Sequence, residues 1–200
     1  MLYAITDSNL MPGEKLFTGV EAVLKSGCKI IQYRDKSSDA AKRLRDATTL
    51  LTLCDHHSAT LIINDDMQLA HQTNAHGVHL GQSDGDVKIA RSLLGKDAVI
   101  GVTCHDSLAL AEKAIADGAN YIAFGRFFSS STKPNASYAP LSLITTARKN
   151  FPNTMIAAIG GITVANGRSV LAAGADMIAV CHDLFAAENI EAKATAFFNL

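Results

Sequence analysis

Hydrophobic residues in this chain fall into short continuous runs, separated by longer stretches in which they recur at every third or fourth position. Strands buried on both faces of a parallel sheet have continuous runs of this kind. The recurring stretches between them have the period of amphipathic helices. This alternation predicts repeated βαβ units and a parallel sheet. The predicted strands cover residues 2–6, 29–34, 60–64, 77–81, 98–103, 121–125, 155–160 and 177–181.

The clearest predicted helix covers residues 38–56. There hydrophobic residues recur at spacings of three and four after Ser37, Ser38 and Asp39, which are candidate N-caps. A second predicted helix, 107–117, begins at Ser107 and ends before Gly118. Shorter helices are predicted over residues 66–73, 86–94 and 164–173, with Asp66 as the cap of the first.

Eight strands alternating with helices fit either a closed barrel or an open doubly wound sheet. No Gly-x-Gly-x-x-Gly motif follows an early strand, which disfavours the open dinucleotide-binding sheet. The predicted fold class is therefore α/β, a single (β/α)8 TIM barrel. No linker, low-complexity tract or change of composition interrupts the chain, so residues 1–200 are expected to form one domain.

The bulk properties narrow the classes of partner. The formal net charge of −1 gives no overall field for nucleic acid or an anionic membrane, so any anion site must be local. No apolar run approaches the ~20 residues that span a bilayer, and residues 1–7 lack the pattern of a signal peptide. Four cysteines without CxxC spacing predict reduced thiols and a cytoplasmic location. The sequence leaves open whether the chain forms a homo-oligomer.

Two aspartates follow neighbouring predicted strands, at the end where parallel α/β folds place their active sites. Asp65 follows the third strand and Asp84 the fourth. Carboxylate oxygens supplemented by water suit Mg²⁺, so the pair is a candidate metal site. The alternative is that each caps the helix that follows it.

Cationic residues occupy similar positions. Arg34 and Lys36 lie two apart at the end of the second strand, on the same side, and Lys133 closes the loop 129–134, which is rich in hydroxyl groups. Together they suit a diphosphate. The alternative for Arg34 and Lys36 is surface pairing with Asp35. Gly160-Gly161 follows the seventh strand, where barrels commonly bind phosphate.

The histidines and cysteines carry weaker signals. His76 and His79 are three apart across a strand and therefore face opposite sides, which disfavours a shared metal. The same rule separates the neighbours in Cys104-His105 and in Cys181-His182, which disfavours a cysteine nucleophile paired with its own histidine. His182 remains a candidate ligand contact at the end of the eighth strand.

Taken together, these motifs resemble the thiamine phosphate synthase family over essentially the whole chain. Any one motif is unspecific, but the ordered set is highly specific. The matching stretches begin with residues 3–7 and continue with Gln32-Tyr33-Arg34-Asp35-Lys36, Ile62-Ile63-Asn64-Asp65, Gly77-Val78-His79-Leu80-Gly81-Gln82-Ser83-Asp84, Gly125 to Lys133, and Ala158-Ile159-Gly160-Gly161-Ile162.

The resemblance implies an enzyme that joins hydroxymethylpyrimidine diphosphate to hydroxyethylthiazole phosphate, or its carboxylated form, with release of diphosphate. It implies Mg²⁺ on Asp65 and Asp84, with Lys133, Thr103 and Arg34 as catalytic residues. The implied pyrimidine diphosphate site is Gln32, Arg34, Lys36, Asn64, Thr103 and Lys133. The implied thiazole phosphate site is Ser130, Ser131, Thr132, Gly161, Cys181 and His182.

Some positions depart from the common family pattern. Ser130 and Thr103 are conservative replacements, whereas Cys181-His182 stands where an aliphatic residue and serine are common, and Arg126 stands where proline is frequent. A thiazole tautomerase of the same barrel family is one alternative. It is disfavoured because such proteins generally lack the metal-binding carboxylates. A non-catalytic phosphate-binding barrel is the other.

Overall fold

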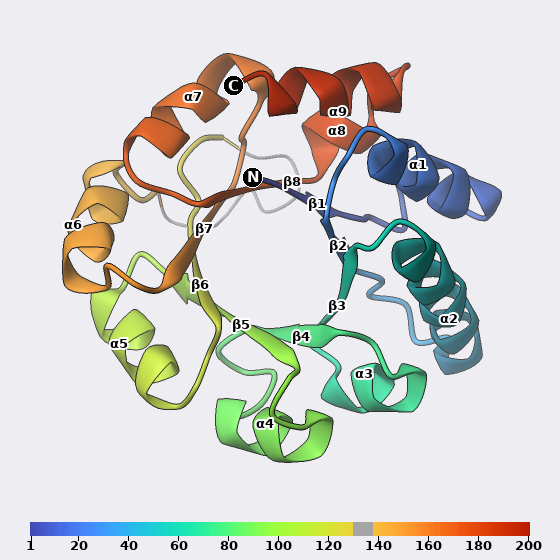
Figure 1. The fold of residues 1–200 in the computed structure, drawn as a ribbon, viewed down its shortest axis with the longest axis horizontal. Helices are drawn as coiled ribbons and strands as arrows, with labels where there is room; N and C mark the ends of the chain where they lie inside the picture. The colour runs from blue at the N-terminus through green and yellow to red at the C-terminus, as the bar shows by residue number, and fades with distance from the viewer. Residues whose placement is uncertain (130–137) are drawn as a thin grey trace.

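The computed structural model describes residues 1–129 and 138–200, and the strands in these ranges form one closed parallel barrel (Figure 1). Each strand pairs in parallel with the next, and β8 pairs with β1 to close the ring. The predicted (β/α)8 barrel is therefore confirmed. The strands are β1 (Leu2–Ile5), β2 (Ile30–Tyr33), β3 (Thr60–Asn64), β4 (Gly77–Leu80), β5 (Val99–His105), β6 (Tyr121–Phe124), β7 (Met155–Ile159) and β8 (Met177–Val180).

The helices form a layer around the barrel, and α9 lies beside α1 where the chain closes on itself (Figure 1). The predicted caps Asp39, Asp66 and Ser107 each accept a hydrogen bond from the first turn of their helix. The helices are α1 (Glu14–Lys25), α2 (Ala40–His56), α3 (Met67–Thr73), α4 (Val87–Leu94), α5 (Leu108–Ala116), α6 (Ser142–Asn150), α7 (Val164–Ala172), α8 (His182–Phe185) and α9 (Ile190–Phe198).

Alternation along the strands builds two separate cores. In β1, Leu2 and Ala4 belong to the core between the strands and the helices, whereas Tyr3 and Ile5 belong to a smaller core inside the barrel. Successive side chains of a strand point to opposite faces, and both faces of these strands are covered. This explains why the strand sequences are continuously hydrophobic.

A glycine in β5 makes room for one of the two tyrosines of the inner core. A Cβ on Gly101 would lie 1.9 Å from Cζ of Tyr121, so any larger residue at this position would displace the phenol ring. Tyr121 is 2% exposed and packs edge-on against Tyr3, with ring centroids 5.8 Å apart. These aromatic rings fill the barrel interior below the mouth.

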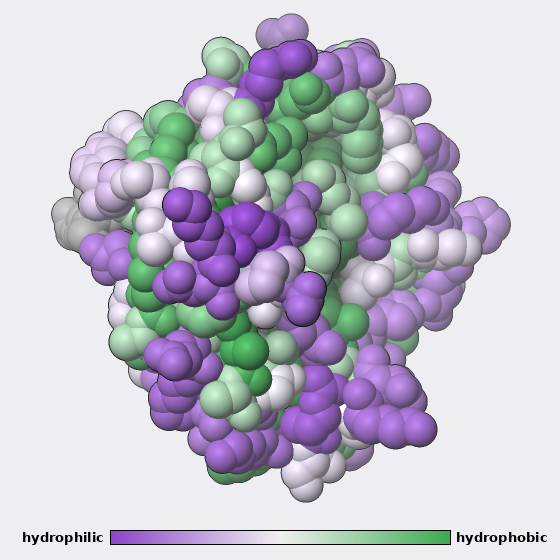
Figure 2. Space-filling view, turned by 60° about the vertical axis from the view of Figure 1, so that its left-hand side comes forward, coloured by the Kyte–Doolittle hydropathy of each residue, from purple (hydrophilic) through white to green (hydrophobic). Residues whose placement is uncertain are grey.

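The outer surface is of mixed polarity. On the face drawn in Figure 2, hydrophilic residues dominate the periphery, and hydrophobic residues reach the surface in smaller areas between them. Among the described residues, no helix combines the length and the hydrophobicity needed to cross a membrane.

Candidate active site

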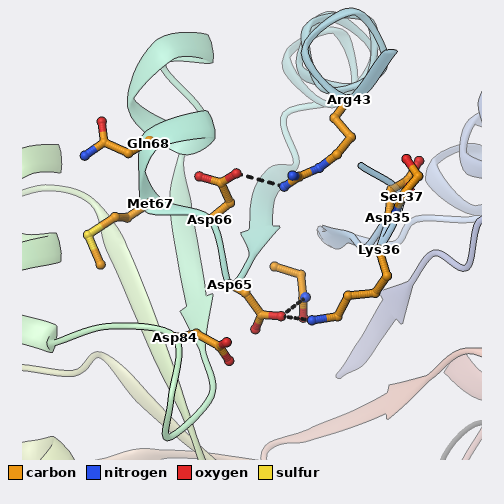
Figure 3. A pocket seen from close by; sticks show the side chains of 10 residues that line it. Asp35, Lys36, Ser37, Arg43, Asp65, Asp66, Met67, Gln68 and Asp84 are labelled. Carbon is orange, nitrogen blue, oxygen red and sulfur yellow. Dashed lines mark hydrogen bonds and ion pairs between the residues drawn. The ribbon is translucent and has the colours of Figure 1, made fainter. Parts of the chain in front are cut away.

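A cavity of about 410 Å³ opens where β2, β3 and β4 end (Figure 3). It lies at the carboxyl ends of the strands, where barrel enzymes carry their active sites. Most of its lining comes from the loops after these strands, and β3 and α2 add one residue each and α3 two. The lining residues are Asp35, Lys36, Ser37, Arg43, Asn64, Asp65, Asp66, Met67, Gln68 and Asp84.

Asp65 is held at this cavity by its backbone. Its N–H donates to the carbonyl of His79 in β4 at 2.7 Å, and its φ of 64° is in the left-handed region, which Asp tolerates better than most residues. Its carboxylate accepts from the Lys36 ammonium and from Nδ2 of Asn64 (Figure 3). The turn after β3 therefore directs Asp65 toward the loop after β2.

Asp84 reaches the same cavity from the loop after β4 (Figure 3). A Cβ on Gly81 would lie 2.2 Å from Oδ2 of Asp84 and 3.9 Å from Oδ1 of Asp65. The absence of a side chain at Gly81 thus leaves the space in which both carboxylates gather. The structure brings together the two residues that the sequence predicted as metal ligands.

The two carboxylates have different pKa values. Burial raises the pKa of Asp84, and the negative charge of Asp65 raises it further. Burial also opposes ionisation of Asp65, but the hydrogen bond and charge of Lys36 outweigh it and lower the pKa of Asp65. Two adjacent carboxylates with one ammonium form a site that an additional cation would stabilise.

Helix capping does not explain either residue. Asp66 caps α3 by accepting from the Leu69 N–H at 2.9 Å, and Asp86 caps α4 by accepting from the Lys88 N–H at 2.7 Å. The alternative that Asp65 and Asp84 are the caps is therefore wrong. In each case the residue that caps the following helix is a different aspartate, one or two positions further along the sequence.

The predicted cations do not form one cluster among the described residues. Lys36 pairs with Asp65, whereas Arg34 Nη1 lies 3.4 Å from Oδ2 of Asp7, after β1. Neither pairs with Asp35, whose carboxylate instead accepts from Lys42 Nζ at 2.6 Å, so the expected alternative of pairing with Asp35 is wrong. Lys133 lies outside the described residues.

Arg43 is a cation at the cavity that the sequence analysis missed. It projects from α2, and its Nη2 donates to Oδ2 of Asp66 at 2.8 Å (Figure 3). Its Nε is buried and has no hydrogen-bond partner among the described residues. Its place on the polar side of the predicted helix 38–56 gave no signal of a role at the mouth.

The other predicted pyrimidine-site residues lie at different depths. Asn64 lines the cavity, Gln32 is 2% exposed inside the barrel, and Thr103 is half-buried in β5. Gln32 Nε2 donates to the hydroxyl of Tyr3 at 2.6 Å, and Thr103 Oγ1 lies 2.8 Å from Nε2 of His79. Gln82, on the loop that carries Asp84, donates to the carbonyl of Thr103 at 2.5 Å.

The described part of the predicted thiazole phosphate site lies after β7 and β8. Gly161 has a φ of 66°, and a Cβ there would lie 2.1 Å from the carbonyl oxygen of Ser129, so its close packing on the segment after β6 accounts for the glycine. His182 is the exposed first residue of α8. Burial raises the pKa of the Cys181 thiol to about 12, with Asp7 adding to the shift. Ser130, Ser131 and Thr132 lie outside the described residues.

The remaining histidine and cysteine signals have structural explanations. His76 Nε2 lies 3.2 Å from Asp55 outside the barrel, whereas His79 is buried inside it, so the predicted separation of the two is confirmed. Cys104 belongs to the outer core and His105 is exposed. Burial raises the pKa of the Cys104 thiol to about 12. A thiolate nucleophile is therefore disfavoured at both cysteine–histidine pairs.

The sequence assigned no role at the site to three inward-facing residues, Tyr3, His79 and Tyr121, which are joined by hydrogen bonds inside the barrel. Strand alternation could have identified Tyr3 and Tyr121. Once one residue of a strand is known to point into the barrel, every second residue from it does so too.

Comparison with known proteins gives matches over nearly the whole chain. The family model described as thiamine monophosphate synthase matches residues 2–184. A thiamine-phosphate synthase of Saccharophagus degradans is 54% identical over 200 residues, which cover 100% of this chain and 92% of the relative.

Solved structures give a consistent result. A thiamine phosphate pyrophosphorylase from Pyrococcus furiosus has a TM-score of 0.89 at 28% identity, covering 99% of this chain and 93% of that one. A 3-hexulose-6-phosphate synthase has a TM-score of 0.73 at 17% identity, covering 98% and 97%, and this likeness concerns the fold alone.

Proposed function

This chain belongs to the thiamine monophosphate synthase family, and we propose from this premise how its site works. It is a transferase that condenses hydroxymethylpyrimidine diphosphate with hydroxyethylthiazole phosphate, or its carboxylated form, to give thiamine phosphate and diphosphate. The observation that carries the assignment to this site is the pair Asp65 and Asp84, gathered with Lys36 in a cavity at the mouth of the barrel. We propose that residues 1–200 act as one catalytic barrel.

The chemistry requires little acid–base work. The carbon–oxygen bond to the diphosphate breaks, its electron pair leaves with the diphosphate, and the lone pair of the thiazole nitrogen forms the new carbon–nitrogen bond. That nitrogen carries no proton, so no general base is needed. This agrees with the raised pKa of the Cys181 thiol, which keeps its proton and would not act as a base. A dissociative displacement needs groups that stabilise the departing negative charge.

We assign that task to cationic and hydroxyl groups at the mouth of the barrel. Lys36 and Arg34 follow β2; Lys36 lines the cavity and pairs with Asp65, whereas Arg34 pairs with Asp7 after β1. A bound diphosphate would compete for both cations, because its charge is higher than that of a carboxylate. Thr103 lies beside the loop that carries Asp84 and would donate its hydroxyl to the leaving group. Lys133, outside the described residues, is proposed to act with them.

The donor set fits Mg²⁺. Two carboxylates lie at Gly81, where burial and the negative charge of Asp65 raise the pKa of Asp84, so a divalent cation would offset the charge of the pair. Among the described residues no group of three or more His, Cys, Asp or Glu could ligate a metal, so waters and substrate oxygens would complete the shell. When bound, Mg²⁺ supplies positive charge that offsets the charge of the diphosphate.

The pyrimidine and the thiazole phosphate are assigned to different parts of the mouth. The aromatic and aliphatic residues inside the barrel form an apolar floor suited to the pyrimidine ring, with Gln32 as the polar contact at that depth and Asn64 nearer the mouth. Gly161, Cys181 and His182, with Ser130, Ser131 and Thr132 of the loop after β6, are proposed to hold the thiazole phosphate.

We also propose a cytoplasmic location and small phosphorylated substrates as the ligands. The four cysteines are unpaired, and Cys28, Cys54 and Cys104 are buried, as expected in a reducing compartment. Nucleic acid and membrane partners are not proposed, because the net charge of −1 provides no attraction for them.

The function is tested by measuring diphosphate release with each substrate alone and with both together. We expect release to require both substrates, because the thiazole nitrogen is the nucleophile. Release from the pyrimidine diphosphate alone at the same rate would identify a hydrolase and contradict the proposal. Binding of both substrates without any release would instead support the non-catalytic alternative.

A further inference from the structure

A chain of hydrogen bonds crosses the interior of the barrel and joins two residues of the proposed substrate site. Gln32 Nε2 donates to the Tyr3 hydroxyl at 2.6 Å, and the hydroxyls of Tyr3 and Tyr121 lie 2.7 Å apart. The Tyr121 hydroxyl lies 2.9 Å from Nδ1 of His79, whose Nε2 lies 2.8 Å from Oγ1 of Thr103. The chain passes through β2, β1, β6, β4 and β5 in turn.

The middle of this chain is shielded from solvent. Tyr3, Tyr121 and His79 are 1%, 2% and 8% exposed, and the rings of His79 and Tyr121 stack with centroids 5.5 Å apart. Burial raises the pKa values of both phenols, so both keep their protons. Buried hydrogen bonds of this kind act as a network in which each bond affects the next.

The number of protons available fixes which group donates and which accepts in each hydrogen bond of this series. Tyr3 accepts from Gln32, so its single proton is available for Tyr121, and the Tyr121 proton for Nδ1 of His79. A neutral imidazole that accepts at Nδ1 carries its proton on Nε2 and donates there to Thr103. The Thr103 hydroxyl, which accepts from His79, then has its own proton available to donate to a substrate.

If the Gln32 amide were rotated so that Oε1 and Nε2 exchanged places, donor and acceptor would exchange roles in every hydrogen bond of the series. If Oε1 of Gln32 accepted from Tyr3, Tyr3 would accept from Tyr121 and Tyr121 from Nδ1 of His79. Nε2 of His79 would then accept the proton of Thr103, which would no longer be available to a substrate. The network therefore has two alternative directions. The orientation of the Gln32 amide at one end decides whether Thr103 at the other end can donate to a substrate.

We propose that Tyr3, Tyr121 and His79 are positioning residues that couple recognition of the pyrimidine ring at Gln32 to the donor role of Thr103 toward the diphosphate. This inference rests on the proposed function, in which Gln32 meets the ring and Thr103 the leaving group. A ring amino group donates to Oε1 of Gln32 and favours the direction in which Thr103 donates. A ring that offers an acceptor at the same place favours the reverse direction. The network therefore selects an aminopyrimidine over its carbonyl counterpart, which offers only an acceptor at that place.

The first test reads the His79 tautomer directly by ¹⁵N NMR of the full chain, with the His79 signals assigned from a His79→Gln variant. The ligands are 4-amino-5-hydroxymethyl-2-methylpyrimidine and inorganic diphosphate. We expect the proton on Nε2 when both are bound. A proton on Nδ1 in that complex would overturn the inference. No turnover is needed, so the result is independent of whether product forms.

The second test is a double-mutant cycle on the binding of hydroxymethylpyrimidine diphosphate, measured by calorimetry. Gln32→Met and Thr103→Val each remove one end of the chain. We expect their effects on Kd to deviate from multiplicativity by about tenfold. The deviation should disappear when Tyr121→Phe interrupts the chain. Independent effects in the parent protein, or the same deviation with Tyr121→Phe, would refute the coupling.

Tyr33→Phe is the matched control for the cycle. Tyr33 is a buried tyrosine of β2 in the outer core, and its hydroxyl donates to Asp35 and Asp46, so it lies outside the chain. The coupling should persist in this background. Its loss there would show that removal of any buried phenol hydroxyl disturbs the site. If diphosphate release fails in the wild type while the tautomer and the coupling are as expected, the proposed function fails and the network stands.

Discussion

Asp65 and Asp84 differ from the aspartates beside them in what their carboxylates contact. Asp66 and Asp86 accept N–H groups of α3 and α4, whereas Asp65 and Asp84 line the cavity without capping a helix. Asp66 also lines the cavity, but its two oxygens accept from the Leu69 N–H and from Arg43. The difference follows from position in the sequence. Asp66 lies one residue closer to α3 than Asp65, and Asp86 lies two residues closer to α4 than Asp84.

This difference provides a controlled substitution. Asp84→Asn removes a cavity charge and should lower kcat by at least about a hundredfold through lost electrostatic stabilisation of the leaving group. Asp86→Asn removes the same charge from the same loop but keeps a good cap, so kcat should stay within about twofold and stability nearly unchanged. Steady-state rates of both variants at saturating Mg²⁺ decide the matter. Equal rates for the two variants would refute the role of Asp84.

Asp35 gives a prediction on the pH dependence of stability. Burial opposes its ionisation, but the hydrogen bonds from Lys42 and the Ser37 N–H outweigh this and lower its pKa to about 2. A carboxylate with a lowered pKa contributes stability above its unfolded pKa of about 3.9, and loses it as the pH falls toward 2. Asp35→Asn should therefore cost about 2 kcal/mol at pH 7.

The measurement is urea unfolding of the wild type and Asp35→Asn between pH 7 and pH 2. The difference in unfolding free energy should be constant down to about pH 5 and shrink below it. A difference that stays constant to pH 2 would show that the ionised form of Asp35 is not what stabilises the fold.

At the scale of elements, β5 and β6 show how one small residue in a strand positions a large one in the next. Gly101 of β5 leaves the space for the Tyr121 ring, and Tyr121 then reaches both Tyr3 and His79. The sequence pattern identified both strands but treated Gly101 as part of a continuous run. What the pattern could not supply is the contact between strands that explains the glycine.

Gly101→Ala tests this packing. The added methyl group would collide with the Tyr121 ring, so we expect a loss of about 1–3 kcal/mol in stability and weaker substrate binding. Gly27→Ala is the control, since no atom lies within 4 Å of a Cβ there and only its φ of 101° is strained. It should lose about 1 kcal/mol or more and keep its Kd for substrate. Thermal unfolding and calorimetry measure both, and an unchanged Kd for Gly101→Ala would contradict the account.

At the scale of the whole molecule, hydrophobic periodicity predicted the alternating strands and helices, and the absence of a dinucleotide-binding motif favoured the closed barrel over an open sheet. Continuous runs separated by helical stretches predicted the strands. Asp65 and Asp84 were found because Asp65 follows β3 directly and Asp84 lies in the short loop after β4. Arg43 and His79 were not found, because their roles depend on which residues the closed ring brings near them. Pairings such as Arg34 with Asp7 join loops far apart in the sequence, and spacing along the chain carries no signal of them.

The central claim is that this barrel joins the two substrates with help from Mg²⁺ at the Asp65–Asp84 pair. The most direct test is chromatography of the products after incubation with hydroxymethylpyrimidine diphosphate and hydroxyethylthiazole phosphate, with Mg²⁺ or with a chelator. The account predicts thiamine phosphate in the presence of Mg²⁺ and little without it. Absence of thiamine phosphate under both conditions, with both substrates bound, would contradict it.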